Sequence, residues 1–351
     1  MKDYDVDPDD LISTTSRVDI DLTKGTAYQK LVAEEIAHYS NIKITDDLKE
    51  GGIHAHKSWI FYFEYLNKNV FGQGFSDEVA VQAERFEQPR LLSLGCGYGG
   101  HDLDIARKLR KPYQLIAVDL NPHIYSEAQR RATSEELNVH FRSLDLNFLH
   151  LRPGAFDVIY AHASVHHVLN LEHLFAELHD GLTENGRLVI LDIVGKTQVL
   201  FWKENVEFAA SLVKRMPRRY RPRVGKRLWR HVWFNPYSIV PRYVEPSEQS
   251  GMEGIRQEEI EAVMLRWFSP IKLARYNAYM RMICTNPYLG PRLDPRKDED
   301  RRYLEGLVRL ELQQVELGNL KPTEIFGVFK KVRKDDAGFF EPERSLEHIR
   351  T

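Results

Sequence analysis

The sequence is poor in cysteine and lacks both long apolar runs and internal repeats. Its 351 residues include two cysteines, Cys96 and Cys284, which excludes a disulfide-stapled fold and favours a reducing compartment. No stretch of about 18 apolar residues occurs, so we expect no membrane-spanning helix. The first ten residues are acidic rather than apolar, so we expect no secretory leader and predict a cytoplasmic protein.

An excess of charge of one sign is also missing. The net charge is −2, from 49 basic and 51 acidic residues, so we expect no specific nucleic-acid partner. The balance hides a basic segment between Lys214 and His231 that no acid interrupts. Residues 214–234 could bind a phosphorylated or lipid-linked substrate. They could also contact an anionic membrane surface peripherally through Trp229 and Trp233. A solvated charged face is the alternative.

Short apolar runs alternate with helical patterns between residues 90 and 194. Strands are predicted at 90–94, 115–118, 139–142, 156–160 and 187–194, and helices at 100–109, 121–137 and 171–181. This alternation predicts a parallel sheet with helices on both faces. The pattern at 270–280 is compatible with a further strand. A last strand is predicted at 324–332, and such a late strand commonly joins the sheet antiparallel.

A glycine-rich loop, LGCGYGG at residues 94–100, follows the first of these strands. Glycines at this place let the backbone approach a ligand at the N-terminus of a helix. The spacing fits two patterns, the G-x-G-x-x-G of dinucleotide enzymes and the G-x-G-x-G of S-adenosylmethionine (SAM) enzymes. Asp119, at the end of the next strand, would bind ribose hydroxyls in either case. The loop alone therefore leaves both cofactors open.

The region after the loop resembles the class I SAM-dependent methyltransferases. Asp145 ends the segment HFRSLD, and the runs at 156–167 and 181–190 follow in the order of that family. A long segment precedes the loop, whereas dinucleotide domains more often begin near it. Further runs, at 94–97, at 193–195, at 246–248 together with 254–260, and at 311–320, resemble a bacterial methyltransferase group associated with glycan and secondary-metabolite gene clusters. The chain departs from that group by an insertion around 249–253 and by Asp192 in place of glutamate.

The resemblance implies which residues hold the cofactor SAM. Glycines of the loop would lie against its methionine and ribose parts, Asp119 would take the ribose hydroxyls, and Asp145 would accept from the adenine amine. Leu120 would pack on the adenine. The full expected set is Gly95, Cys96, Gly97, Tyr98, Gly99, Asp119, Leu120, Asp145, Leu146, Ala161 and His162.

Two residues are candidates for a catalytic base, which is needed when the acceptor is a hydroxyl or a protonated amine. His166 follows the fourth strand, where acceptors approach in this fold, and imidazole accepts protons near neutral pH. Asp192 lies at the carboxyl end of the fifth strand, where ligands collect in open α/β sheets. For both residues the alternative is a structural hydrogen bond, and neither is chosen over the other.

The acceptor site is predicted only by residue type. Its candidates are Trp59, Tyr62, His101, His167 and Arg219. Aromatic side chains stack on sugars and rings. Histidines at 54, 56, 162, 166 and 167 could join Asp192 in binding a divalent ion, but their spacing matches no familiar pattern, so no metal site is predicted.

The predicted fold is a doubly wound α/β sheet of seven strands, the last antiparallel, with a helical N-terminal cap and a helical insertion after the fifth strand. The expected segments are 1–88 (cap or lid), 89–195 (SAM-binding core), 196–268 (basic helical insertion), 269–333 (final strands and helix) and 334–351 (charged tail).

The predicted activity is methyl transfer from SAM to a small-molecule or glycan-type acceptor, at oxygen first and nitrogen next. An NAD(P)-dependent oxidoreductase and a non-catalytic SAM-binding or regulatory protein are the rivals. A homodimer is compatible with the sequence, and the oligomeric state stays open.

Overall fold

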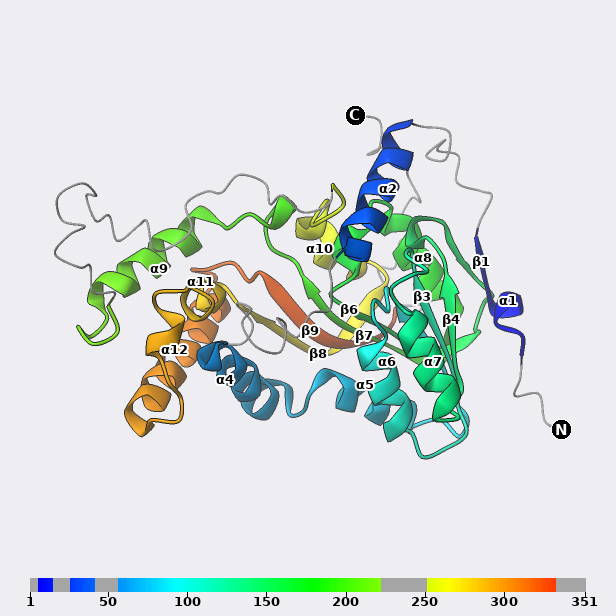
Figure 1. Cartoon of the computed structure of the whole chain (residues 1–351), viewed down its shortest axis with the longest axis horizontal. Helices are drawn as coiled ribbons and strands as arrows, with labels where there is room; N and C mark the ends of the chain where they lie inside the picture. Colours follow the sequence, from blue (N-terminus) through cyan, green and yellow to red (C-terminus); the bar gives the residue numbers. More distant parts are fainter. Residues whose placement is uncertain (1–5, 15–25, 42–55, 222–250, 333–351) are drawn as a thin grey trace.

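A computed structural model describes residues 6–14, 26–41, 56–221 and 251–332. Its centre is a seven-stranded sheet with the order β4-β3-β2-β6-β7-β9-β8 (Figure 1). The strands are β2 (Arg90–Leu94), β3 (Gln114–Asp119), β4 (Val139–Ser143), β6 (Phe156–His162), β7 (Leu182–Ile193), β8 (Phe268–Tyr276) and β9 (Glu324–Lys331). The order reverses between β2 and β6, which creates a topological switch point at the carboxyl ends of these two strands.

Strand direction agrees with the prediction of a mixed sheet. The pairs β2–β3, β3–β4, β2–β6 and β6–β7 are parallel, whereas β9 runs antiparallel to both β7 and β8. The last strand in the chain therefore lies inside the sheet and not at its edge, and β8 forms the edge. The predicted fold class, a seven-stranded doubly wound sheet with an antiparallel last strand, is confirmed.

Side chains alternate between two hydrophobic cores, one on each face of the sheet. In β2, Leu91 belongs to one buried cluster and Leu92 to the other. Because successive side chains of a strand point to opposite faces, strands buried on both sides become almost continuously apolar. This accounts for the short apolar runs by which the strands were predicted.

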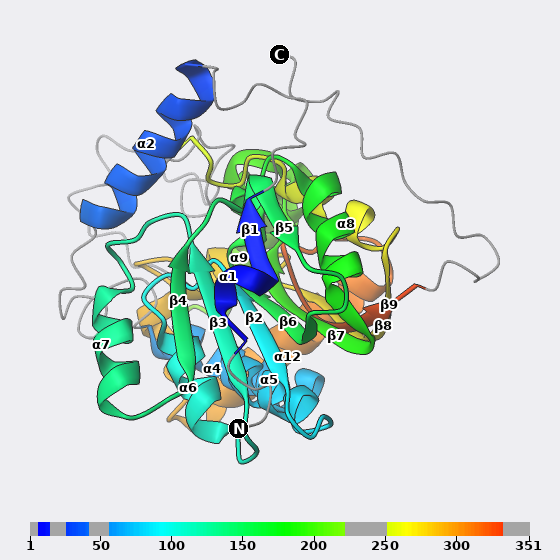
Figure 2. The same cartoon turned by 90° about the vertical axis from the view of Figure 1, so that its right-hand side faces the viewer.

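Helices cover both faces of the sheet. The described helices are α1 (Pro8–Leu11), α2 (Thr26–Asn41), α4 (Lys57–Leu66), α5 (Phe75–Ala83), α6 (Gly100–Lys108), α7 (Ser126–Ser134), α8 (Leu171–Gly181), α9 (Lys203–Arg215), α10 (Ile260–Met264), α11 (Met280–Cys284) and α12 (Asp298–Glu316). Helices α5, α6 and α7 pack on one face, and α8 and α10 on the other. Helix α2 stands above the carboxyl ends of the strands (Figures 1 and 2).

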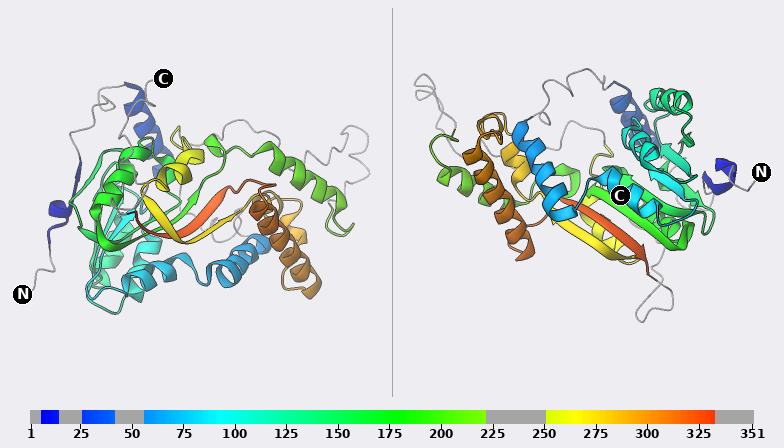
Figure 3. Two further views of the ribbon diagram at one scale, coloured as in Figure 1. Left: turned by 180° about the vertical axis from the view of Figure 1, so that it is seen from behind. Right: turned by 90° about the horizontal axis from the view of Figure 1, so that it is seen from below.

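A group of helices extends the molecule beyond β8. Helices α4, α11 and α12 pack together, and α9 projects from the same end (Figure 3). A five-residue π-helix, Asn67–Phe71, follows α4 directly. It ends at Gly72, whose φ of 87° is a conformation that residues with a side chain rarely adopt. Helices α9 and α10 lie in the described parts of the predicted helical insertion, 196–268, which follows the fifth sheet strand, β7.

The N-terminal segment differs from its prediction. Residues 1–88 were predicted to form a helical cap, but the short strand β1 (Ile12–Thr14) follows α1 within them and pairs antiparallel with β5 (Leu149–Leu151). Figure 2 shows this two-stranded sheet beside the main one. Leu11 is fully buried there, so this side chain anchors an otherwise polar segment to the hydrophobic core. Three residues are too few to show a strand period in the sequence.

Two predicted features fall mostly outside the described residues. The described residues do not include 222–231 of the basic segment, and therefore not Trp229. They also do not include Trp233, His54 or the tail 334–351. Within the described part, no helix combines the length and the apolar character that crossing a membrane requires.

Candidate cofactor and acceptor site

The loop after β2 can be built only with glycine at two positions. Gly95 has a φ of 65°, and a Cβ there would lie 2.4 Å from the Cβ of Ser164. Gly99 has a φ of 70°, and its Cβ would lie 2.5 Å from that of Ala128 in α7. Positive φ strains residues that carry a side chain, and these contacts are below van der Waals distance. The loop therefore presents bare backbone at the switch point of the sheet.

Asp119, the last residue of β3, ties this loop to the next strand. One carboxylate oxygen accepts the backbone N–H of Gly97 at 2.8 Å, and the other accepts that of Asn121 at 2.8 Å. Burial raises the pKa of Asp119, although these two N–H groups lower it. Each oxygen keeps a second lone pair, so the side chain can still accept hydroxyl groups from a ligand.

Asp145 lies two residues after the end of β4, as Asp119 lies at the end of β3. Its Oδ1 accepts the backbone N–H of Asn147 at 2.9 Å, and its Oδ2 accepts the hydroxyl of Tyr28, which comes from α2. Asn147 also donates its side-chain amide to the Tyr28 oxygen at 3.0 Å. The carboxylate predicted to bind adenine is thus held in place, with the N-terminal helix against it.

A pocket opens between these carboxylates and α2. It is lined by Glu35, Tyr39, Gly95, Gly97, Asp119, Leu120, Asn121, Ile124, Asp145, Leu146, Asn147, Ala163, Ser164, His167, Val168 and Met252. Helix α2 is fastened over it, since Asn121 donates its side-chain amide to the Ile36 carbonyl at 3.2 Å and Tyr98 donates its hydroxyl to the Tyr39 carbonyl at 3.3 Å. The sequence predicted a helix here but not Glu35 or Tyr39 as pocket residues.

The lining of the pocket fits SAM. Three carboxylates, Glu35, Asp119 and Asp145, face it, and the described residues that line it include no lysine or arginine. SAM carries a positive sulfonium and an ammonium group, which an acidic, partly desolvated wall favours. The glycine-rich loop after β2 leaves room for the ligand to contact backbone N–H groups. Six of the predicted cofactor residues line the pocket: Gly95, Gly97, Asp119, Leu120, Asp145 and Leu146.

Five predicted cofactor residues lie beside the pocket. Cys96, Tyr98 and Gly99 complete the loop, with burial raising the pKa of the Cys96 thiol. Ala161 is fully buried inside β6, and His162 packs between Phe75 and His101. Ala161 and His162 are therefore not among the residues that line the pocket. The chain leaves the sheet after His162, so Ala163 and Ser164 reach the pocket instead.

The rings of His101, which is exposed, and His162, which is partly buried, lie against each other. Their ring centroids lie 4.0 Å apart. The Nδ1 of His101 is hydrogen-bonded to the Ser76 hydroxyl at 3.0 Å. Burial, together with the charge of His101, lowers the pKa of His162 to about 3, and burial also lowers the pKa of His101. His101, expected to contact the substrate, lies outside the lining of the pocket.

Asp192 lies beneath the pocket and organises the loop after β6. Its fully buried carboxylate accepts the backbone N–H groups of Ser164 at 3.0 Å and Val165 at 2.7 Å, and contacts the Nδ1 of His166 at 2.6 Å. Burial alone would raise the pKa of Asp192, but His166 and the two N–H groups lower it. This position makes Asp192 a positioning residue for the loop.

His166, the other candidate base, is also buried. Its Nε2 lies 3.6 Å from Glu253, so a carboxylate faces each ring nitrogen. Burial alone would lower the pKa of His166, but Asp192 and Glu253 raise it to about 10. His167, expected to contact the substrate, does line the pocket, and its Nδ1 lies 2.9 Å from Glu35.

The remaining acceptor candidates do not reach the pocket. Trp59 and Tyr62 are core residues of α4, and the Tyr62 hydroxyl donates to the buried Glu311 at 2.6 Å. Arg219 lies after α9, where it pairs with Glu299 and covers the ring of Tyr220. In the sequence, the aromatic residues of α4 suggested the lining of a ligand pocket. In the structure, their rings pack α4 against the edge of the sheet.

Residues 91–186 match a family described as "Methyltransferase domain". Phosphoethanolamine N-methyltransferase 1 of Arabidopsis thaliana is 29% identical over 133 residues, which are 36% of this chain and 27% of that protein. Demethylmenaquinone methyltransferase of Thermus thermophilus is 32% identical over 104 residues, 29% of this chain and 46% of that protein. The aligned region thus spans about a quarter to a half of these relatives.

Solved structures are similar as well. A phosphoethanolamine N-methyltransferase 2 of Haemonchus contortus, in complex with SAM, matches with a TM-score of 0.38 and 17% identity, covering 82% of this chain and 59% of that one. The fold assignment rests on the strand order of the chain itself. Residues 91–186, which contain the glycine loop and the two acids Asp119 and Asp145, thus match a methyltransferase domain, and the pocket beside them fits SAM.

Proposed function

We propose that this protein transfers the methyl group of SAM to a small-molecule acceptor, at an oxygen atom. The observation that carries the proposal is the pocket in which Gly95, Asp119 and Asp145 meet the acidic face of α2. When bound, SAM supplies a methyl group on a positively charged sulfur. The chain must then hold the acceptor in line with that methyl and exclude water. Helix α2 closes the pocket and suits the second task.

An oxygen acceptor agrees with the polar groups at this end of the pocket. A hydroxyl must lose its proton when it is methylated, so a proton acceptor nearby favours the reaction. His167 and Glu35 line the pocket and lie in contact with each other, and Tyr39 donates its hydroxyl to Glu253 at 3.2 Å. His166 and Asp192 lie behind them. We therefore assign proton removal to His167 and Glu35, which line the pocket. His166 and Asp192, buried behind them, have a supporting role.

A nitrogen acceptor is the second candidate, because several similar proteins are named as phosphoethanolamine N-methyltransferases. A phosphorylated or glycan-type acceptor stays within the proposal. The same groups would serve a protonated amine, which must also lose a proton before it attacks the methyl.

Calorimetric titration with SAM, S-adenosylhomocysteine and NAD(H) tests the cofactor. Binding of the first two without the third supports the proposal, and labelled methyl groups then identify the acceptor among hydroxyl and amine compounds. Binding of NAD(H) alone would replace the proposal with an oxidoreductase. Binding of SAM without methyl transfer to any acceptor class would favour a regulatory protein.

A further inference from the structure

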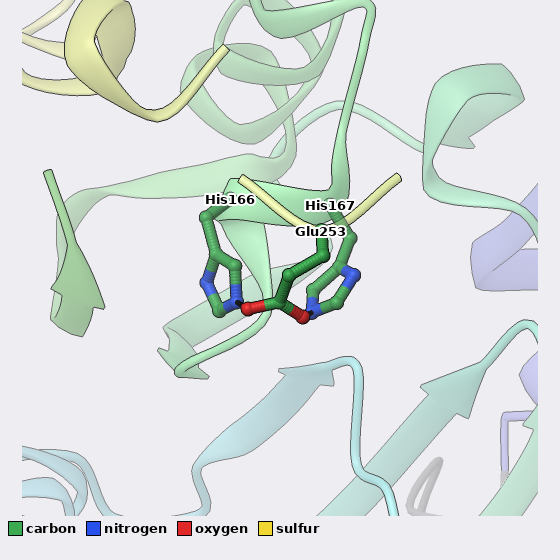
Figure 4. A group of neighbouring side chains, drawn as sticks. All are labelled: His166, His167 and Glu253. Carbon is green, nitrogen blue, oxygen red and sulfur yellow. Dashed lines mark ion pairs between the residues drawn. The ribbon is translucent and has the colours of Figure 1, made fainter. Parts of the chain in front are cut away.

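Two histidines and a glutamate from distant parts of the chain converge beside the pocket. His166 and His167 form the short 3-10 turn after β6, Val165–His167, and Glu253 comes from the segment before α10. Figure 4 shows the Glu253 carboxylate between the two imidazole rings. One oxygen lies 3.6 Å from the Nε2 of His166, and the other lies 3.4 Å from the Nε2 of His167. Both separations exceed the usual hydrogen-bond range of about 2.7–3.2 Å.

A second carboxylate lies behind each imidazole, in a hydrogen bond with the Nδ1 of His166 but without one to the Nδ1 of His167. Asp192 contacts the Nδ1 of His166 at 2.6 Å, and Glu35 lies 2.9 Å from the Nδ1 of His167. Histidines that bind metals usually donate one ring N–H to a carboxylate, which fixes the tautomer and leaves the other nitrogen for the ion. Here both Nδ1 atoms face carboxylates, and both Nε2 atoms face Glu253.

The charges of the cluster also favour a cation. Asp192 is fully buried and Glu253 nearly so, with about 10% of its side chain exposed. Within the described parts of the chain, neither carboxylate forms an ion pair with a lysine or an arginine; their printed ion pairs are with histidines. Buried carboxylates need a compensating charge or a metal.

We propose that His166, His167 and Glu253 bind a divalent transition-metal ion through the two Nε2 atoms and a carboxylate oxygen. Each of the three residues offers one ligand atom that lies within 4.8 Å of those of the other two. Ligand atoms about 2.1 Å from a tetrahedral ion lie about 3.4 Å apart, close to the observed N···O separations. Two imidazoles and one carboxylate suit zinc, iron, manganese or cobalt better than magnesium or calcium.

Three protein ligands leave at least one position of the ion open, as in catalytic metal sites. His167 also lines the pocket that fits SAM, so an ion held by His167 would lie beside that pocket. An acceptor hydroxyl bound to the ion would lose its proton more easily. This role for the ion rests on the proposed methyl transfer, whereas binding of the ion does not.

Metal titration of the full chain tests the site directly. Protein stripped with a chelator is titrated with Co²⁺ and with Zn²⁺ by calorimetry, and Co²⁺ is also followed by its visible absorption. We expect one ion per chain and an absorption typical of mixed nitrogen and oxygen ligands. Glu253→Gln keeps the size of the side chain but removes its charge, and should weaken Co²⁺ binding at least about tenfold.

His150→Ala is the matched control. His150 also contacts a carboxylate, Glu177, at 3.1 Å, but it is not part of the three-residue cluster. Its removal should leave Co²⁺ affinity unchanged. If Glu253→Gln fails to fold, as judged by circular dichroism, His167→Ala replaces it, since that side chain is partly exposed.

The outcomes separate the two proposals. No metal binding by the wild type, or equal binding by Glu253→Gln, would overturn the metal site and leave an ion-pair network. Metal binding with the expected loss in Glu253→Gln supports the site. If SAM fails to bind while Co²⁺ does, the methyltransferase proposal falls and the metal site stands.

Discussion

The pocket has two walls that are built in different ways. The sheet wall consists of the glycine loop, Asp119 and Asp145, each placed directly after a strand. The helix wall consists of Glu35 and Tyr39 from α2, with Met252 from the segment before α10. The sheet wall was predicted from the sequence, because its residues follow strands at fixed spacing. The helix wall was not, because nothing local marks its residues.

The two walls also differ in what holds them. Asp119 is fixed by backbone N–H groups of the adjacent loops, Gly97 and Asn121. Tyr28 and Tyr39 are fixed by side chains 117 and 214 residues away in sequence. Backbone contacts within one sheet persist as long as the sheet is folded, whereas a helix held by a few side chains can open locally. We therefore expect the sheet wall to govern stability and the helix wall to govern access.

The largest expected effect is that of Gly95→Ala in the sheet wall. The new Cβ would meet Ser164 at 2.4 Å and force a positive φ on alanine. We expect a loss of about 2–5 kcal/mol in the free energy of unfolding, from overpacking and strain together. Gly97→Ala has the same strain but no contact within 4 Å, so it should cost only about 1–2 kcal/mol. Equal costs in urea unfolding would contradict the packing argument.

Asp119→Ala should weaken SAM binding without unfolding the protein. Loss of a charged acceptor for the ribose hydroxyls costs about 1.5–3 kcal/mol, or about 10- to 150-fold in Kd. Calorimetry measures this change. Asp104→Ala, an exposed position on α6 that pairs with Lys108, is the control and should leave Kd unchanged. An unaltered Kd for Asp119→Ala would contradict the assignment of the sheet wall to the cofactor.

The sheet that carries this wall should also be sensitive to acid, through His162 at the end of β6. Burial and the neighbouring His101 lower its pKa to about 3 in the folded chain, against about 6.5 when unfolded. The unfolded state therefore binds the additional proton below pH 6.5, and stability falls as the pH drops towards 3. At pH 5 the loss is about 2 kcal/mol.

His162→Phe should remove this loss. Free energies of unfolding measured for both proteins at pH 7.5 and pH 5 check the prediction, and the variant should show the smaller decrease. Parallel decreases in the two proteins would mean that other groups account for the acid sensitivity.

The smallest effect is expected in the helix wall. Tyr28→Phe removes the hydroxyl that donates to Asp145 and should cost about 1–2 kcal/mol. Because α2 can open alone, we expect faster hydrogen exchange in residues 26–41 while the strands keep their protection. Tyr65→Phe, on α4 outside the pocket, is the control. Faster exchange throughout the sheet would mean that the two walls open together.

Local sequence determined more of the fold than of the site. The strand Arg90–Leu94 and the helix Leu171–Gly181 have the predicted bounds, because an apolar run before glycines and a helix closed by glycine are local patterns. The helix predicted at 121–137 is shorter, Ser126–Ser134, because the residues after Asn121 form a turn in which its side chain accepts the His123 N–H.

The sequence by itself determined the alternation of strands and helices, the glycine loop, and the two acids that follow β3 and β4. These features depend on residues close together in the chain, where spacing and side-chain type decide the backbone conformation. The tertiary structure decided which side chains face the pocket. It buried Trp59 and Tyr62 in the core, placed Asp192 beneath the loop, and brought Glu253 to His166 and His167. Such contacts join distant segments, so they depend on how the helices pack and not on local sequence.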